Sequence, residues 1–155
     1  MGEKLNKRLK QVKPLNIEHE AVLNLFLAGN FIRKKIDDVC SKYNITNAQY
    51  NVLRILKGNH PDGYPRCEII PRMIDQAPDV TRIIDNLEKQ HLVSRSVSND
   101  DRRLSVTKIT SKGLNLIMQM EDEMRSVDKY IIENLTKTEI RQLSEICEKI
   151  YGSQL

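Results

Sequence analysis

Apolar positions recur at helical spacing over a long stretch near the N-terminal end of the chain. From Asn16 to about Tyr43 they alternate in steps of three and four residues, which predicts one long helix. In the first half of this stretch a second apolar face is added, so we expect part of the helix to contact a partner subunit. The first face consists of positions 22, 25, 29, 32, 36, 39 and 43, and the second of Leu23, Phe26, Leu27 and Phe31.

Two further amphipathic helices are predicted at the C-terminal end. Thr110 caps the first, which runs to about Leu135 with apolar residues at coiled-coil-like spacing. Thr136 and Glu139 form a capping box that begins the last helix. Its inward residues are predicted to be Ile140, Leu143, Cys147 and Ile150.

The first 13 residues form a basic segment with five lysines or arginines against one glutamate. A solvated, frayed terminus is the favoured interpretation. The alternative is a short docked helix, because Leu5, Leu9 and Val12 recur at helical spacing.

The middle of the chain begins with a short helix. Thr46 and Gln49 match a capping box, and the helix that follows is expected to end at Gly58. The stretch 58–65, GNHPDGYP, is dense in glycine and proline and is predicted to be a loop.

Two more short helices are predicted next, separated by a tight turn at Gln76 and Ala77. The first covers Arg66 to Asp75, although Pro71 inside it forfeits a backbone hydrogen bond. The second covers Pro78 to about Gln90, with Pro78 at its first position and Val80, Ile84 and Leu87 on its apolar face.

Alternating residues in 92–97 and 104–109 predict a β-hairpin around the polar tip SNDDRR. The middle therefore has the order helix, helix, tight turn, helix, hairpin, which is the plan of a winged helix-turn-helix. The predicted fold is mainly α (α+β), with this lobe at 46–110 and dimerisation helices at 14–43 and 111–155 in one domain, 1–155.

The helix after the tight turn carries the candidate DNA contacts. Its polar face includes Asp79, Thr81, Arg82 and Asn86. Arg82 and Asn86 are four residues apart, so a side chain suited to guanine lies beside one suited to adenine. An ordinary solvated helix face has the same composition, and spacing alone leaves both interpretations open.

Two arginines at the hairpin tip, Arg102 and Arg103, suit the negative potential of a narrow minor groove. An ordinary polar turn, with Asp101 pairing an arginine to fix the loop, is compatible with the same residues. The two interpretations do not exclude each other.

Composition agrees with a helix-rich protein: there is no tryptophan, and the 155 residues fit one domain. Lysine and arginine exceed the acidic residues by 25 to 21, which permits a polyanionic partner without requiring one. The three cysteines lack metal-ligand spacing, no cofactor is indicated, and no apolar run reaches the ~18 residues of a membrane span. We expect a cytoplasmic protein that binds neither metal nor membrane.

Four runs in the middle of the chain together resemble the MarR family. They are TNAQYNVLRIL (46–56), CEIIPRMI (67–74), PDVTRIIDNLEKQHLVSR (78–95) and NDDRRLSVTKITSKGLNLI (99–117). Asp101 and Arg103 match the family's D-x-R at the wing tip, and residues 109–113 match its L-T-x-K-G helix start. His91 departs from the pattern, because the family commonly has glycine there.

The resemblance implies a homodimer in which the terminal helices interlock and each subunit offers one winged helix-turn-helix. It further implies a transcriptional regulator, usually a repressor on a pseudo-palindromic operator in double-stranded DNA, released by a small aromatic or anionic effector. Carried over by position, the recognition helix contributes Asp79, Thr81 and Arg82, and the wing contributes Arg102 and Arg103.

The same sequence also bears on other functions. A thiol-based redox regulator would use Cys67, whose thiolate a helix N-terminus would favour. A winged helix used only for protein contacts is compatible with the fold. Enzymatic activity is not expected, because His19, His60 and His91 are scattered and no nucleophile or phosphate-binding glycine loop accompanies them.

Overall fold

Helices dominate the computed structural model, which describes residues 2–10, 13, 15–75, 79–97 and 105–152. Within these residues a three-stranded sheet accompanies the helices. In chain order the elements are α1 (Glu3–Leu9), α2 (Ile17–Lys42), α3 (Asn47–Gly58), β1 (Tyr64–Pro65), α4 (Arg66–Ile69), the 3-10 helix η1 (Ile70–Arg72), α5 (Val80–Lys89), β2 (Val93–Val97), β3 (Ser105–Ile109), α6 (Ser111–Ile132) and α7 (Lys137–Tyr151).

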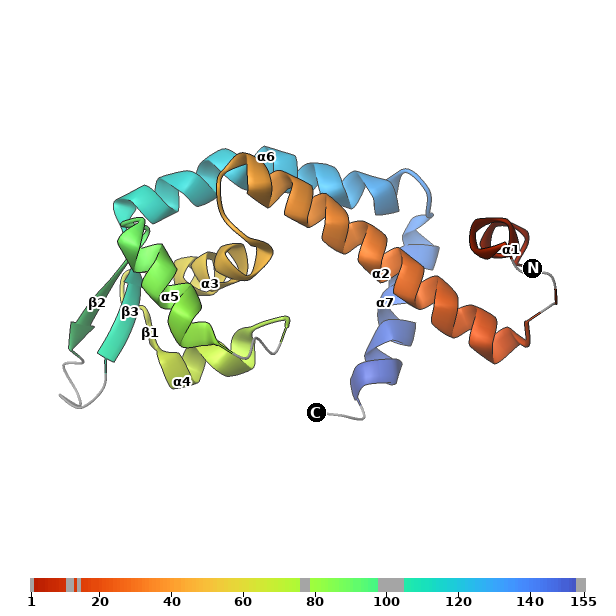
Figure 1. Ribbon diagram of the computed structural model, residues 1–155, viewed down its shortest axis with the longest axis horizontal. Helices are drawn as coiled ribbons and strands as arrows, with labels where there is room; N and C mark the ends of the chain where they lie inside the picture. The colour runs from red at the N-terminus through yellow and green to blue at the C-terminus, as the bar shows by residue number, and fades with distance from the viewer. Residues whose placement is uncertain (1, 11–12, 14, 76–78, 98–104, 153–155) are drawn as a thin grey trace.

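The two long helices, α2 and α6, pack side by side and connect the two ends of the molecule (Figure 1). A lobe made of α3, α4, α5 and the strands lies at one end, whereas α1 and α7 lie toward the other. Asn16 caps α2 by accepting from the His19 N–H at 2.9 Å, and Thr110 caps α6 by accepting from the Gly113 N–H at 3.1 Å. The predicted long helices are therefore confirmed, and α6 ends at Ile132 instead of about Leu135.

The core of the lobe lies between α3 and α5. Val52, Leu53 and Leu56 of α3 are fully buried, and Ile84 and Leu87 of α5 pack in the same core. Both predicted capping boxes, Thr46 with Gln49 and Thr136 with Glu139, are present in full. The sequence pattern thus predicted the start of α3, the start of α7 and the buried face of α5.

The sheet has the antiparallel order β1-β3-β2. The predicted hairpin is confirmed, with Arg95 of β2 opposite Thr107 of β3, and its tip, 98–104, lies outside the described residues. Strand β1 was not predicted, because its two residues, one of them a proline, are too short to show alternation. Tyr64 pairs with Thr107 after Gly63, whose φ of +74° turns the chain onto β3.

Two predictions around the tight turn need correction. The helix expected over Arg66 to Asp75 ends at Ile69 and tightens into η1, because Pro71 has no N–H to donate along an α-helix. The next helix begins at Val80, with Asp79 as its N-cap, so Pro78 is not its first residue. The turn itself, residues 76–78, lies outside the described residues.

Both ends of the chain also differ from expectation. Residues Glu3–Leu9 form the short helix α1, in which Leu5 is buried, so the favoured frayed terminus is wrong over these residues. At the other end, the inward face predicted for α7 is wrong for a single chain, because none of the helix's residues is buried. Across the described residues, no helix is both long enough and apolar enough to cross a membrane.

Candidate nucleic-acid interface

Helix α5 presents a polar face opposite its buried one. Thr81, Arg82 and Asn86 are exposed on it, and the Arg82 side chain is 79% accessible. Arg82 and Asn86 lie one helical turn apart, as the sequence predicted, so both reach the same side of the helix. This face has the residue types that read base edges in a major groove.

Asp79 has a structural task at the start of α5. Its carboxylate accepts a hydrogen bond from the Arg82 N–H at 3.0 Å, and a second oxygen lies 3.6 Å from Arg82 Nε. This N-cap satisfies one of the first free N–H groups of the helix. Asp79 therefore orients the backbone and side chain of Arg82.

Thr81 is held by a residue that sequence reasoning missed. Arg66, at the start of α4, donates a hydrogen bond from Nη1 to Thr81 Oγ1 at 3.0 Å. The two residues are 15 positions apart and belong to different helices, so no local pattern linked them. The hydrogen bond joins α4 to the exposed face of α5 and adds a cation there.

Arg95 ties the wing strand β2 to helix α5. It donates from Nη1 to Glu88 at 2.9 Å and from Nη2 to Asp85. The sequence predicted Arg95 only as a strand residue. Its two ion pairs offset both carboxylates on the side of α5 that faces β2, which lowers the negative charge that DNA phosphates would meet.

Strand β2, which contains Arg95, is the first strand of the wing. Ser94 to Val97 of β2 are all exposed, and Val97 is 62% accessible although apolar. Asp101, Arg102 and Arg103 lie outside the described residues, so their predicted roles remain predictions.

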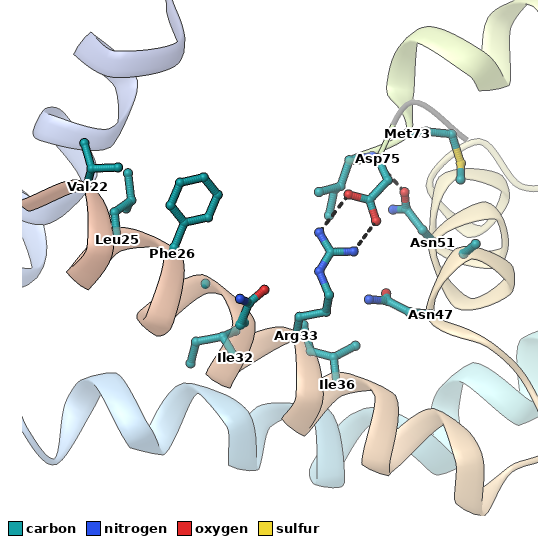
Figure 2. Close-up of a pocket in the computed structure, with 14 residues that line it drawn as sticks. Val22, Leu25, Phe26, Ile32, Arg33, Ile36, Asn47, Asn51, Met73 and Asp75 are labelled. Carbon is teal, nitrogen blue, oxygen red and sulfur yellow. Dashed lines mark hydrogen bonds and ion pairs between the residues drawn. The ribbon is translucent and has the colours of Figure 1, made fainter. Parts of the chain in front are cut away.

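A pocket of about 420 Å³ opens between α2 and the lobe (Figure 2). Its walls include apolar residues of α2 on one side and Met73 and Ile74 on the other. Arg33 reaches across it from α2 to Asp75, and the Ile74 N–H donates to Asn51 Oδ1 at 2.9 Å. The pKa of Asp75 is lowered by its hydrogen bonds and charge interaction with Arg33.

The three thiols have different surroundings. Cys67 is exposed at the start of α4, Cys147 is half-buried on α7, and Cys40 is buried on α2. The pKa of Cys40 is raised to about 11, mainly by burial and secondly by the negative charge of Asp37. A thiol with this pKa is a poor nucleophile. Among the residues that the structure describes, no group of three His, Cys, Asp or Glu side chains could hold a metal ion.

Comparison with known proteins agrees with this arrangement. Residues 45–105 match the family model described as MarR family. The transcriptional regulator MhqR of Bacillus subtilis is 25% identical over 136 residues, covering 84% of this chain and 92% of its own length.

Solved structures share the fold. A MarR transcription factor from Planctomyces limnophilus is 29% identical and has a TM-score of 0.67, covering 88% of this chain and 98% of its own. MepR of S. aureus in complex with DNA has a TM-score of 0.77 at 21% identity, covering 90% and 99%. The winged helix-turn-helix lobe at 45–105 therefore matches the MarR family model, and the chain shares the winged helix fold of solved MarR-type transcriptional regulators.

Proposed function

We propose that the chain acts as a homodimeric repressor that binds a pseudo-palindromic operator and responds to a small effector. The dimer is inferred from helix α7, which is amphipathic although none of its residues is buried within one chain. Unburied apolar faces of this size mark an interface. The exposed apolar side chains on α7 and at the end of α6 are Ile132, Leu143, Ile146, Ile150 and Tyr151.

In the dimer, each α5 enters a major groove through its exposed face. Arg82 and Asn86 contact base edges, and Thr81 lies beside them with Arg66. Asp79 supports Arg82 at the helix start. The wing brings Arg102 and Arg103 to the adjacent minor groove, where Asp101 fixes the loop.

The pocket is the proposed effector site. It lies between the proposed dimerisation helix α2 and the lobe that carries α5, so a ligand there can change how the two recognition helices are spaced. The organohalide-sensing regulator RdhR-CbdbA1625 has been solved with 2,4-dichlorophenol bound and shares this fold, with a TM-score of 0.76 at 19% identity, covering 92% of this chain and 84% of its own. An aromatic or anionic effector agrees with the pocket's apolar walls and single arginine.

Fluorescence anisotropy with duplexes from the region upstream of the gene tests this function. We expect saturable binding that weakens as salt rises, and lower transcription from that promoter in vitro. Arg82→Ala and Arg103→Ala should each weaken binding by roughly 1–3 kcal/mol. Arg125→Ala on α6 removes the same charge away from the proposed DNA-contacting residues of α5 and the wing, and it should leave DNA binding unchanged.

Absence of specific DNA binding by the folded protein would overturn the proposal. The alternative would then be a winged helix that contacts only other proteins.

A further inference from the structure

Arg66 and Thr81 join the starts of the two helices of the helix-turn-helix. Arg66, the first residue of α4, donates from Nη1 to Thr81 Oγ1 at 3.0 Å, and Thr81 lies in the first turn of α5. Both residues are exposed. The hydrogen bond therefore places the Arg66 guanidinium on the flank of the exposed face of α5.

The backbone at Arg66 is held from both sides. Arg66 directly follows strand β1, in which Pro65 pairs with Val106 of β3. Three residues further on, Ile69 of α4 is fully buried in the lobe core. Because the backbone is fixed and the side chain is hydrogen-bonded, Arg66 needs little further ordering to bind a ligand.

The charge of Arg66 is not offset by a carboxylate from the part of the chain that the structure describes. Glu68, on the same helix, lies 2.6 Å from Arg72, and Asp79, the N-cap of α5, lies 3.6 Å from Arg82 Nε. A guanidinium has five N–H donors, and the hydrogen bond between the helices uses one of them. Arg66 thus offers a positive charge and further donors to an external anion.

A DNA phosphate is the anion that suits this position. When the second helix of a helix-turn-helix lies in the major groove, the first helix crosses the sugar-phosphate backbone. In this chain α4 with η1 forms the first helix and α5 the second. A guanidinium can donate two parallel hydrogen bonds to one phosphate group. Such a contact carries no sequence information, so it adds affinity for any duplex.

We propose that Arg66 binds a backbone phosphate beside the groove that α5 enters, and that Thr81 acts through Arg66 by holding the guanidinium in place. The inference rests on DNA binding by α5, as proposed above, and adds a contact outside the recognition helix and the wing. Arg66 is the residue that contacts DNA, and Thr81 is its positioning residue.

Anisotropy titrations over a range of salt concentrations test the inference, with a duplex from the region upstream of the gene and a scrambled duplex of the same composition. Arg66→Gln should weaken binding to both duplexes by the same factor, roughly five-fold, and lower the slope of log affinity against log salt by about one. Arg66→Lys keeps the charge and should keep the slope. Arg54→Gln, which removes another exposed arginine of the lobe from α3, should leave affinity and slope unchanged. Circular dichroism establishes that each variant is folded.

A double-mutant cycle tests the role of Thr81. Thr81→Val keeps the shape of the side chain but removes the hydroxyl, and it should weaken binding to both duplexes about three-fold. Thr81→Ser keeps the hydroxyl and should bind as the wild type does. In the Arg66→Gln background Thr81→Val should have no further effect, because its loss acts only through the guanidinium.

Three results would overturn the inference: an unchanged salt slope for Arg66→Gln, a loss of affinity confined to one duplex, or additive losses for Arg66→Gln and Thr81→Val. If the wild type binds both duplexes equally while Arg66→Gln lowers the slope, the proposed repressor function fails and the assignment of Arg66 stands. If the wild type prefers the upstream duplex and Arg66→Gln binds as the wild type does, only the assignment fails. Binding to neither duplex would overturn both.

Discussion

The backbone of Gly113 in α6 lies directly against the carbonyl oxygen of Leu92, and a methyl group added at Gly113 would approach that oxygen to 2.3 Å. Thr110 strengthens the same junction, because its hydroxyl donates to the His91 carbonyl at 2.8 Å. The link between α5 and β2 is therefore packed tightly against the start of α6.

Gly113→Ala should destabilise the protein by about 1–3 kcal/mol, because neither backbone can move away without disturbing the junction. Urea denaturation measures this as a lower midpoint. Gly58→Ala is the matched control, since a methyl group there meets nothing within 4 Å and also favours the helix. Equal urea midpoints for the Gly113 variant and the wild type would contradict the close contact between Gly113 and the Leu92 carbonyl.

His91 adopts the left-handed conformation, with φ of +60°, at the position where the MarR pattern commonly has glycine. Glycine carries no penalty in this conformation, so His91→Gly should raise the free energy of unfolding by roughly 1 kcal/mol. The comparison variant is Gln90→Gly at the helical φ of −83°, which should lower it. Thermal unfolding measures both, and a destabilised His91→Gly would contradict the account.

Arg95→Ala should weaken operator binding, because Asp85 and Glu88 are then left unpaired on the helix that approaches the phosphates. The triple variant Asp85→Asn, Glu88→Gln, Arg95→Ala removes those charges and should recover much of the affinity. Anisotropy titrations at two salt concentrations measure this. If the triple variant binds no better than Arg95→Ala, the arginine acts through some role other than charge compensation.

The thiols should react in the order of their exposure. At pH 8 an aromatic disulfide reagent should modify Cys67 rapidly, whereas Cys40, buried and with a pKa of about 11, should react only on unfolding. Cys67→Ser removes the fast phase. A regulator controlled by Cys67 oxidation would lose its peroxide response in this variant, whereas the effector mechanism proposed here leaves DNA binding by Cys67→Ser intact.

Local patterns predicted most of the elements because they depend on neighbours in the sequence. Both capping boxes need residues only three positions apart, and the buried face of α5 follows from helical periodicity. Strand β1 could not be predicted from local patterns, because its two residues form a strand only by pairing with β3. Burial on α7 could not be predicted from its own periodicity either, because none of the residues on its apolar face is buried against the part of the chain that the structure describes.

The candidate site was predictable only in part, since its exposed face follows from periodicity but its contacts do not. The Arg33–Asp75 pair spans 42 residues, and the hydrogen bond from Arg66 to Thr81 spans 15. Such pairs depend on how α2 and α4 pack against the lobe, which no spacing rule encodes. Asp79 was predicted as a DNA contact, and the structure adds that its carboxylate caps α5.

The most direct test of the central claim is a hydroxyl-radical footprint on the upstream region, combined with the mass of the complex by sedimentation. The account predicts two chains of 18.0 kDa on one duplex and two protected patches on the same face, centred about one helical turn apart, ~10 base pairs. A single protected patch under one chain, or no protection at any salt concentration, would contradict it.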